Sequence, residues 1–199
     1  MRLLIATTNP HKGQEIRAVL AGLPIEWITL DAWPDLAPPA EPGRTFEDNA
    51  RAKAGYYARA TGQLTVAEDS GLEIDALDGG PGVESARYAG EETSYPEKFA
   101  RLYGALDAAG GRESPARFVC ALVLATPGAI LFEARGVVEG RIAPEPAGAN
   151  GFGYDPIFFY PPYGRTFAEV TPEQKGAVSH RGAAFRELRA YLTRERKDR

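Results

Sequence analysis

The sequence predicts an α/β fold in which helices flank a mixed β-sheet. A strand, a helix and a second strand follow one another at the start of the chain, an order typical of parallel strands joined by a crossover. Near the middle, only three residues, Thr126 to Gly128, separate two apolar runs, which predicts an antiparallel hairpin. Because both kinds of pairing are expected, the sheet should be mixed.

The opening β-α-β unit covers residues 2–30. Residues 2–8, RLLIATT, predict a buried strand, and residues 12–21 predict a helix with its apolar side chains on one face. Residues 25–30, IEWITL, alternate like a second strand. The following segment, 31–44, holds four prolines and is expected to be an ordered surface loop.

A second helix should begin after Thr45, which stands at an N-cap position with Asp48 three residues later as the shorter form of a capping box. We expect this helix to reach about Ala60. Two short strand fragments, LTVA and LEID, are expected on either side of an acidic pair. A glycine-rich loop, DGGPGVESARYAG, and a helix near residues 95–109 should follow.

The hairpin and the elements after it complete the prediction. Its arms are residues 116–125 and 129–139, followed by a Gly/Pro loop, PEPAGANGFGYDP, and a short strand, IFFY. From Pro172 we expect a helix that breaks near Ser179 and resumes to about Thr193. The charged tail, RERKDR, is expected to fray.

Composition narrows the class of protein. A chain of 199 residues with 44% hydrophobic residues can bury a sizeable core, and a net charge of −4 argues against a broad basic surface for nucleic acid. The single cysteine, Cys120, lies in an apolar run, which excludes an internal disulfide and predicts a buried, inert thiol in a reducing compartment. No apolar run approaches the length of a membrane span or a signal-peptide core. We therefore expect a cytoplasmic protein without a membrane partner.

The stretch VAEDSGLEID places two acids, Glu68 and Asp69, directly before Ser70 and Gly71. Asp-Ser-Gly is also a common turn sequence, because Asp and Ser bond to their own backbone and glycine tolerates positive φ. The functional interpretation is a pair of hard oxygen ligands for a cation. Cation-rich elements elsewhere would favour it.

The first loop, TTNPHKGQE, offers such an element. Thr7, Thr8 and Asn9 supply polar side chains, and Lys12 arrives at a helix N-terminus, where backbone N–H groups favour an anion. The loop lacks the glycine spacing of the common phosphate-binding loops. Simple N-capping by Asn9 is the alternative.

Asn49 and Lys53 are four residues apart on the second predicted helix and so share one face. Two polar residues on one helix face usually lie on the solvent-exposed surface. They matter to chemistry only if that face turns toward the acidic turn that contains Glu68 and Asp69.

Two further segments suit a planar base. In NGFGYDP, Phe152 can stack on a ring, its flanking glycines allow close approach, and Asp155 can accept from an N–H group, although a hydrophobic hairpin cap explains the same residues. In EQKGAVSHRG, Lys175, His180 and Arg181 lie close together. A lone histidine is more often structural, and one cysteine with two separated histidines makes a zinc site improbable. Together, these elements fit a nucleoside triphosphate with Mg²⁺.

Six motifs in order, TTNPHK, TFEDNARAKA, AEDSGL, PGVESARYAG, FGYDPIF and KGAVSHRG, resemble the inosine triphosphate pyrophosphatase family of non-standard purine (XTP/dITP) pyrophosphatases. The resemblance runs from residue 2 to about 192. It implies a single domain over residues 1–199, with an elongated two-lobed α/β fold, a long mixed sheet flanked by helices and a substrate cleft between the lobes. It also implies a homodimer that hydrolyses ITP, dITP and XTP to the monophosphate and pyrophosphate with Mg²⁺ as cofactor.

The resemblance assigns roles residue by residue. Asp69 would be the general base and a metal ligand, with Glu41 and Glu68 as further ligands. The residues that would contact substrate are Thr7, Thr8, Asn9, Pro10, His11, Lys12, Lys53, Ser70, Phe152, Gly153, Tyr154, Asp155, Lys175, His180 and Arg181. The family often has Asp-Asp at positions 68 and 69 and Glu at position 48, so this chain keeps the charge but varies the residue.

Two other functions fit part of the pattern. A related class of similar architecture hydrolyses dTTP and UTP, but it opens with a Ser/Arg-rich loop in place of TTNPHK. A catalytically silent nucleotide sensor would keep the pocket without hydrolysis. The acidic pair argues against the sensor, because carboxylates beside phosphates are costly to keep without a metal.

Overall fold

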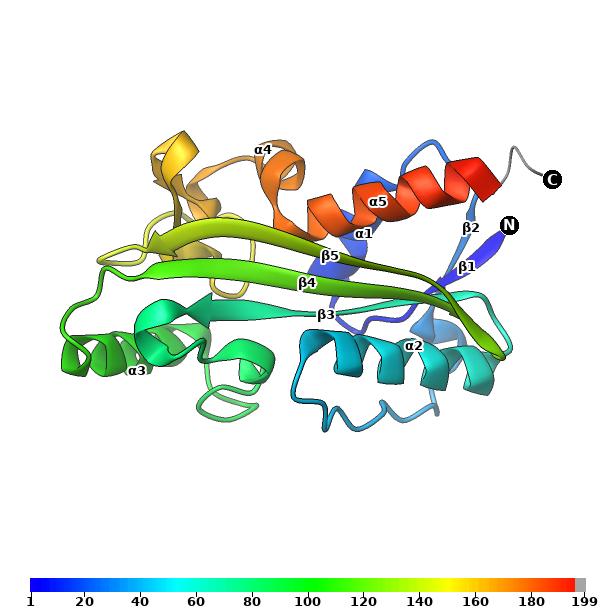
Figure 1. Cartoon of the computed structure of the whole chain (residues 1–199), viewed down its shortest axis with the longest axis horizontal. Coiled ribbons are helices and arrows are strands. Elements are labelled where there is room, and N and C mark those ends of the chain that lie inside the picture. Colours follow the sequence, from blue (N-terminus) through cyan, green and yellow to red (C-terminus); the bar gives the residue numbers. More distant parts are fainter. Residues whose placement is uncertain (196–199) are drawn as a thin grey trace. The chain divides into compact units, whose positions relative to one another are not determined.

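The structure, a computed structural model, describes residues 1–195 and contains a seven-stranded sheet (Figure 1). The strand order is β2-β1-β3-β4-β5-β6-β7. The strands are β1 (Arg2–Ile5), β2 (Glu26–Thr29), β3 (Thr65–Ile74), β4 (Pro115–Thr126), β5 (Ala129–Ile142), β6 (Phe158–Tyr160) and β7 (Arg165–Thr166). The helices are α1 (Pro10–Val19), α2 (Phe46–Thr61), α3 (Tyr95–Ala108), α4 (Pro172–Val178) and α5 (His180–Glu195).

The sheet is mixed, as predicted. Strand β1 pairs in parallel with both β2 and β3, whereas β6 pairs antiparallel with β5 and β7. The opening β-α-β unit and the β4-β5 hairpin are both present. The α/β fold class read from the sequence is therefore confirmed.

The chain forms two compact units, each with its own core. Unit 1 comprises Met1–Asp69, Cys120–Gly136 and the chain from His180 onward. Unit 2 comprises Ser70–Val119 and Val137–Ser179. Strands β3, β4 and β5 each contribute residues to both units, because the unit boundaries fall inside these strands.

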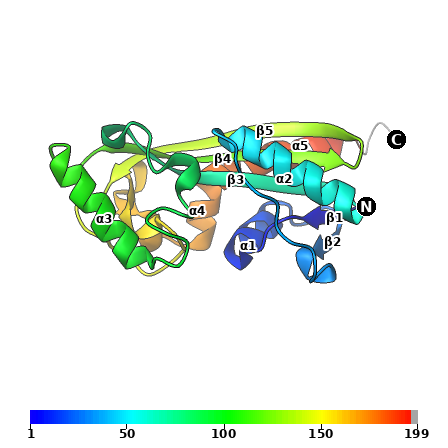
Figure 2. The ribbon, with the colours of Figure 1, turned by 90° about the horizontal axis from the view of Figure 1, so that it is seen from below.

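In unit 1, helices cover both faces of the sheet. Helix α2 lies on one face, and α5 lies on the other with α1 beside it (Figures 1 and 2). Leu3, Ile5 and Val66 of the strands pack with Ile16 of α1 and Phe185 of α5 in the core of this unit. Because the apolar faces of α1 and α5 pack into the same core, polar side chains beside those faces lie at the edge of that core.

In unit 2, aromatic side chains fill the core. Phe118 packs on Phe158 with ring centroids 4.5 Å apart, and Phe158 packs on Phe167 at 4.9 Å. Leu102 and Leu106 of α3 belong to the same cluster. This core supports the segment that contains FGYD.

Local sequence signals located the helices well. Thr45 caps α2, since its Oγ1 accepts a hydrogen bond from the Asp48 N–H at 3.1 Å. The chain also breaks between α4 and α5 at Ser179, as expected. The charged tail was expected to fray; α5 includes its first two residues, and residues 196–199 lie outside the described part of the chain.

The prediction of two strand fragments around the acidic pair was wrong. Residues 65–74 form one continuous strand, so Glu68 and Asp69 lie inside β3 and not in a turn. Neighbouring strands on both sides keep this segment extended. Position 71 of this strand requires glycine, because a Cβ there would lie 2.5 Å from the carbonyl oxygen of Gly82. Cross-strand pairing and close packing thus override the turn tendency of Asp-Ser-Gly.

None of the described helices is long and apolar enough to cross a membrane.

Candidate functional site

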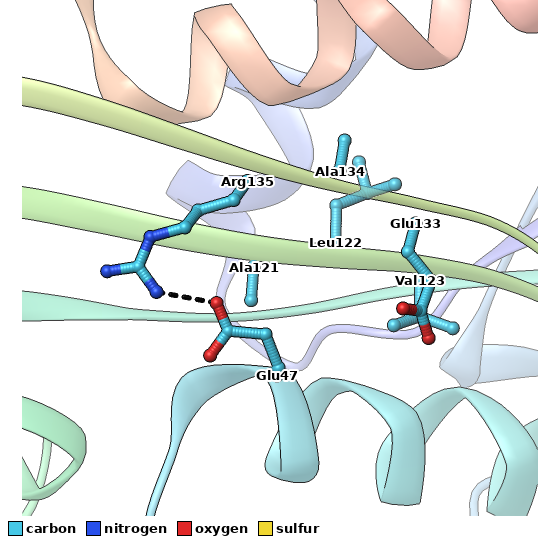
Figure 3. Close-up of a pocket in the computed structure, with 7 residues that line it drawn as sticks. All are labelled: Glu47, Ala121, Leu122, Val123, Glu133, Ala134 and Arg135. Carbon is cyan, nitrogen blue, oxygen red and sulfur yellow. Dashed lines mark hydrogen bonds and ion pairs between the residues drawn. The ribbon is translucent and has the colours of Figure 1, made fainter.

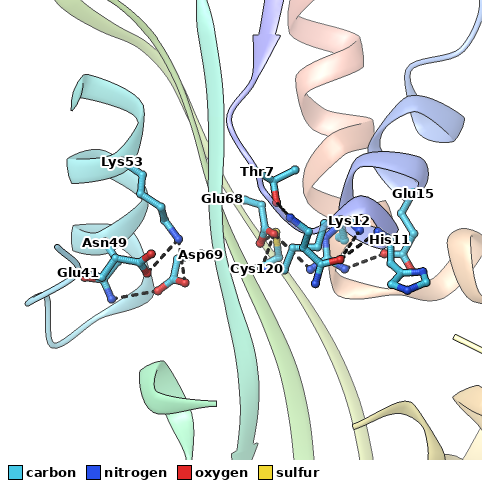
Figure 4. Close-up of polar contacts among 12 residues, drawn as sticks. Thr7, His11, Lys12, Glu15, Glu41, Asn49, Lys53, Glu68, Asp69 and Cys120 are labelled. Atoms are coloured by element: carbon cyan, nitrogen blue, oxygen red, sulfur yellow. Dashed lines mark hydrogen bonds and ion pairs between the residues drawn. The ribbon is translucent and has the colours of Figure 1, made fainter. Parts of the chain in front are cut away.

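The two adjacent carboxylates of β3 enter different environments. Successive side chains of a strand point to opposite faces of the sheet. Asp69 therefore faces α2, and Glu68 faces α1 and α5 (Figure 4). Both are buried, at 7% and 4% relative exposure. Each carboxylate has its own set of polar partners in unit 1.

Asp69 is held by two side chains of α2. The Asn49 amide donates to Asp69 Oδ2 at 3.0 Å, and the Lys53 ammonium donates to Asp69 Oδ1 at 3.2 Å. The same ammonium contacts Glu41 Oε2 at 3.0 Å (Figure 4). Asn49 and Lys53 are thus not a solvated surface pair, and their shared face does turn toward Asp69.

Burial sets the protonation behaviour of this cluster. Burial raises the pKa of Asp69, and the opposing effects of the Lys53 charge and the Asn49 hydrogen bond do not cancel the rise. Burial alone would lower the pKa of Lys53, but the nearby carboxylates, Asp69 foremost, raise it. Lys53 therefore stays charged, while Asp69 is a stronger base than an exposed aspartate.

Glu68 lies between two cations on the other face. Its Oε1 accepts from Lys12 Nζ at 2.7 Å and from an Arg181 nitrogen at 3.4 Å. Arg181 also contacts Glu15 Oε2 at 2.7 Å. Two cations and two carboxylates thus form a charge-balanced cluster, and the Cys120 thiol lies 3.5 Å from Glu68 Oε2.

This cluster keeps Glu68 ionised. Burial would raise the pKa of Glu68, but Arg181 first and then Lys12 hold that pKa well below its usual range. Burial, together with the Glu68 charge, raises the pKa of the Cys120 thiol far above normal. The prediction of a buried cysteine is confirmed.

The first loop caps its helix. Asn9 Oδ1 accepts from the N–H groups of His11 and Lys12, at 3.0 and 3.3 Å, and Thr7 Oγ1 accepts from the Asn9 N–H at 3.1 Å. N-capping by Asn9 is therefore present. Thr8, Pro10 and His11 are exposed around it, and the partly exposed Lys12 projects from the first turn to Glu68.

The FGYD segment of unit 2 is an internally bonded loop. Asp155 Oδ2 accepts from the Phe152 N–H at 2.8 Å and from Lys175 Nζ at 2.5 Å, and the Lys175 ammonium lies 4.5 Å from the centre of the Phe152 ring. The Tyr154 hydroxyl donates to the Ser85 carbonyl at 2.7 Å. Gly151 has φ +72 and leaves no room for a Cβ beside the Asp155 carboxylate, so glycine is required there.

The remaining predicted residues are placed as follows. Ser70 and Gly153 belong to unit 2 and are partly exposed. His180 and Arg181 open α5 in unit 1 and are buried, at 4% and 2% exposure. Unit 1 thus gathers Lys12, Glu68 and Arg181 around one contact, and Glu41, Lys53 and Asp69 around another.

The carboxylates of the Asp69 cluster suit a magnesium ion. Glu41 and Asp69 present hard oxygen atoms that already lie within 3.2 Å of one ammonium nitrogen. Among the described residues there is no group of three or more His, Cys, Asp or Glu side chains that could hold a metal. Mg²⁺ commonly takes only one or two carboxylates and completes its shell with water and phosphate oxygens. Glu68 contacts Lys12 and Arg181 instead, so it does not fit the same ligand set.

A surface pocket elsewhere in unit 1 contains none of the predicted site residues. It lies between α2, β4 and β5, and an ion pair of 2.6 Å joins Glu47 and Arg135 across it (Figure 3). Its charged side chains are already paired, since Glu133 binds Arg51. This pocket therefore adds no residue to the two clusters at Glu68 and Asp69.

These features define an α/β protein in which paired carboxylates and buried cations surround one strand, as in proteins that act on phosphorylated ligands. Comparison with known families gives the assignment. The model of the Ham1 family matches residues 3–191, and the chain belongs to that family.

Relatives and solved structures agree. A dITP/XTP pyrophosphatase of Exiguobacterium sp. is 47% identical over 96% of this chain and 97% of its own length. The dITP/XTP pyrophosphatase of Geobacter sulfurreducens is 45% identical over 96% of both chains. The structure of a HAM1 protein from Coxiella burnetii has a TM-score of 0.90 with 41% identity, covering 98% of this chain and 99% of that one.

Two residues of these clusters escaped the list of predicted site residues. Asn49 had a signal, its spacing from Lys53, but only the fold shows that Asp69 faces it. No feature of the sequence around Glu15 pointed to a role in the site. Its importance is its ion pair with Arg181, and Arg181 is far away in the sequence.

Proposed function

We propose that this chain is a Mg²⁺-dependent nucleoside-triphosphate pyrophosphatase that hydrolyses the non-standard purine nucleotides ITP, dITP and XTP. The products are the nucleoside monophosphate and pyrophosphate. Membership of the Ham1 family supports the proposal, as do the relatives named dITP/XTP pyrophosphatase that match almost the whole chain.

The observation that carries the proposal is that the two adjacent carboxylates have different partners: Asp69 contacts Asn49 and Lys53, whereas Glu68 lies between Lys12 and Arg181. The pKa of Asp69 is raised by burial, whereas the cations around Glu68 hold its pKa low. Neighbouring acids whose environments separate their pKa values are typical of sites that divide acid–base work. Asp69 is therefore the best candidate for the general base.

The proposed mechanism uses the residues of unit 1 in distinct roles. Asp69 accepts a proton from water as the water oxygen bonds to the α-phosphorus. The bond from that phosphorus to the bridging oxygen breaks, and pyrophosphate leaves. Lys12 and Lys53 neutralise the negative charge that accumulates on the leaving group.

Glu41 and Asp69 are the residues that would hold the metal. When bound, Mg²⁺ polarises phosphate oxygens and lowers the pKa of a water molecule. Lys53 lies against both carboxylates and keeps them together.

Base selection follows from hydrogen-bond donors. Hypoxanthine and xanthine carry a 6-oxo acceptor, to which His180 or Arg181 would donate, whereas adenine carries an amino group there and leaves buried donors unpaired. Such a mismatch can reduce kcat/KM by several orders of magnitude. The contacts assigned to Thr7 to Lys12, Ser70, Phe152 to Asp155 and Lys175 stay predictions drawn from the family.

We also propose a homodimer in the cytoplasm. These two assignments follow from the family resemblance and the cysteine content, and size-exclusion chromatography with light scattering tests the first of them.

A pyrophosphate-release assay with Mg²⁺ tests the function. Wild type and Asp69→Asn would be compared on ITP, XTP, dTTP, GTP and ATP. We expect wild type to turn over ITP and XTP, with ATP slow because adenine carries the 6-amino group. Guanine shares the 6-oxo group, so rejection of GTP must come from its 2-position, and slow GTP turnover is expected from the family resemblance. Asp69→Asn should lose about 10²- to 10⁴-fold in kcat, the range typical of a positioned base.

Asp107→Asn is the matched control, because this aspartate forms a half-exposed pair with Arg112 in unit 2. It should retain full activity. Preference for dTTP would favour the related pyrimidine class. Binding of ITP without turnover would contradict the proposed enzymatic activity and would favour a nucleotide sensor.

A further inference from the structure

Asn49 is a buried polar side chain that the proposed mechanism does not use. It has 0% exposure and lies on α2, one turn before Lys53. We propose that Asn49 is a positioning residue that fixes the orientation of the Asp69 carboxylate, and that the backbone N–H of Gly43 fixes Asn49 in turn. The proposal rests on the proposed function, because it adds a residue to the support of the general base.

The contacts form a short chain through the amide. The Gly43 N–H donates to Asn49 Oδ1 at 2.8 Å, and Asn49 Nδ2 donates to Asp69 Oδ2 at 3.0 Å. All three residues belong to unit 1. These two hydrogen bonds therefore connect the proline-rich loop to β3 through the Asn49 side chain.

The backbone of Gly43 determines which way the amide points. A backbone N–H can only donate, so it selects the oxygen end of the amide. The nitrogen end is then the end that faces Asp69. A carboxylate that is ionised only accepts, so this orientation satisfies every partner.

The loop is built closely around this amide. A Cβ added to Gly43 would lie 2.5 Å from Asn49 Oδ1 and 2.9 Å from the Asp48 Cβ. Any side chain at position 43 would therefore displace the Asn49 amide. The glycine is explained by this approach, since its φ is not in the left-handed region.

Asn49 and Lys53 divide the two oxygens of Asp69 between them. Lys53 holds Oδ1 and also contacts Glu41, while Asn49 holds Oδ2 and also contacts Gly43. The loop residues 41 and 43 thus support both contacts. A carboxylate held at both oxygens cannot rotate. A general base fixed in its productive orientation supports a higher kcat than one that samples several orientations.

Two variants interrupt the chain at different points. Asn49→Asp keeps the acceptor for Gly43 but puts an oxygen where the donor to Asp69 stood. Gly43→Ala leaves Asn49 in the sequence and pushes its amide away. Both should lower kcat for ITP by about 10- to 100-fold with KM unchanged, because misplacing a catalytic group slows the chemical step more than binding.

Amide hydrogen exchange gives a readout that does not depend on turnover or metal. The Gly43 N–H should stay protected in Asn49→Asp and lose protection in Asn49→Leu, which removes the acceptor. Ser114→Ala is the control for general destabilisation: Ser114 is buried at 3% exposure, and its Oγ accepts from the Ala76 N–H at 3.0 Å in unit 2. It should keep wild-type kcat.

Wild-type kcat in Asn49→Asp or in Gly43→Ala would overturn the proposal, and so would a kcat loss of equal size in Ser114→Ala. Exchange of the Gly43 amide that is equally fast in wild type and Asn49→Leu would show that the bond does not form. If wild type releases no pyrophosphate, the proposed function fails. The exchange experiment still tests the contact chain in that case.

Discussion

At the scale of single residues, neighbours in the sequence have different chemistry because the strand turns them to different surroundings. Asp69 meets one ammonium and one amide, so burial dominates and raises its pKa. Glu68 meets a lysine and a buried arginine, so the cations dominate and lower its pKa. Two carboxyl groups adjacent in the sequence thus have pKa values shifted in opposite directions by their surroundings.

We predict that Glu68→Gln destabilises the fold. It removes the charge between Lys12 and Arg181, and the 2%-exposed Arg181 then loses one of its carboxylate partners. Loss of one partner of a buried ion pair typically costs about 3 kcal/mol in the free energy of unfolding. Urea unfolding of wild type and variant measures this difference.

The effect should depend on pH. Because folding lowers the pKa of Glu68, its stabilisation is present above the ordinary value of 4.5 and is lost as the pH falls through the folded-state pKa. The difference between wild type and Glu68→Gln should therefore shrink in acid. Glu84→Gln is the control, since its pair with Arg87 is exposed and such pairs contribute about 0.5 kcal/mol. Equal effects of the two substitutions would contradict the prediction.

At the scale of elements, close backbone contact positions the start of α5. A Cβ at Gly136 of β5 would collide with the His180 carbonyl oxygen and lie 2.8 Å from the Ala184 nitrogen. Backbone atoms of a helix cannot move aside as a flexible side chain can. The glycine therefore allows β5 to hold the turn of α5 that carries His180 and Arg181.

We predict that Gly136→Ala destabilises the protein by about 3 kcal/mol or more, the upper range of overpacking costs. Gly104→Ala is the matched control, because Gly104 lies inside α3 with open space around a Cβ. It should stabilise the protein by about 0.5–1 kcal/mol through helix propensity. Thermal unfolding of both variants provides the measurement. Gly136→Ala with an unchanged melting temperature would show that the contact is not rigid.

At the scale of the whole molecule, each unit has its own apolar core, and the only cysteine of the chain lies in the core of unit 1. Cys120 has 0% exposure. Its thiolate is disfavoured by burial and by the adjacent Glu68 charge. Thiol reactivity therefore reports on the opening of that core.

We predict that Cys120 does not react with a thiol reagent such as DTNB in the native protein at mildly alkaline pH. One thiol should be titrated after unfolding in guanidinium chloride, because only the exposed thiolate is nucleophilic. The rate below the unfolding transition should follow the opening of unit 1. Rapid reaction of the native protein would contradict the buried position of the thiol.

Local patterns were enough to find most elements, and long-range contacts explain what was missed. Thr45 and Asn9 cap helices as their sequence positions indicate, because capping depends on residues three apart or less. The continuity of β3 could not be predicted, because its neighbouring strands override a turn sequence. The contacts of Glu15 with Arg181 depend on residues 166 positions apart.

The alternation of Glu68 and Asp69 along β3 has a consequence for which sequence changes the chain tolerates. Deletion or insertion of one residue just before this pair would exchange the faces of the two carboxylates. A deletion would place Asp69 beside Lys12 and Arg181, and an insertion would place Glu68 beside Asn49 and Lys53. In each case the other carboxylate would lie two positions away along the strand, although the composition of the segment would hardly change. Homologous chains should therefore vary in residue type along this strand far more readily than in its length.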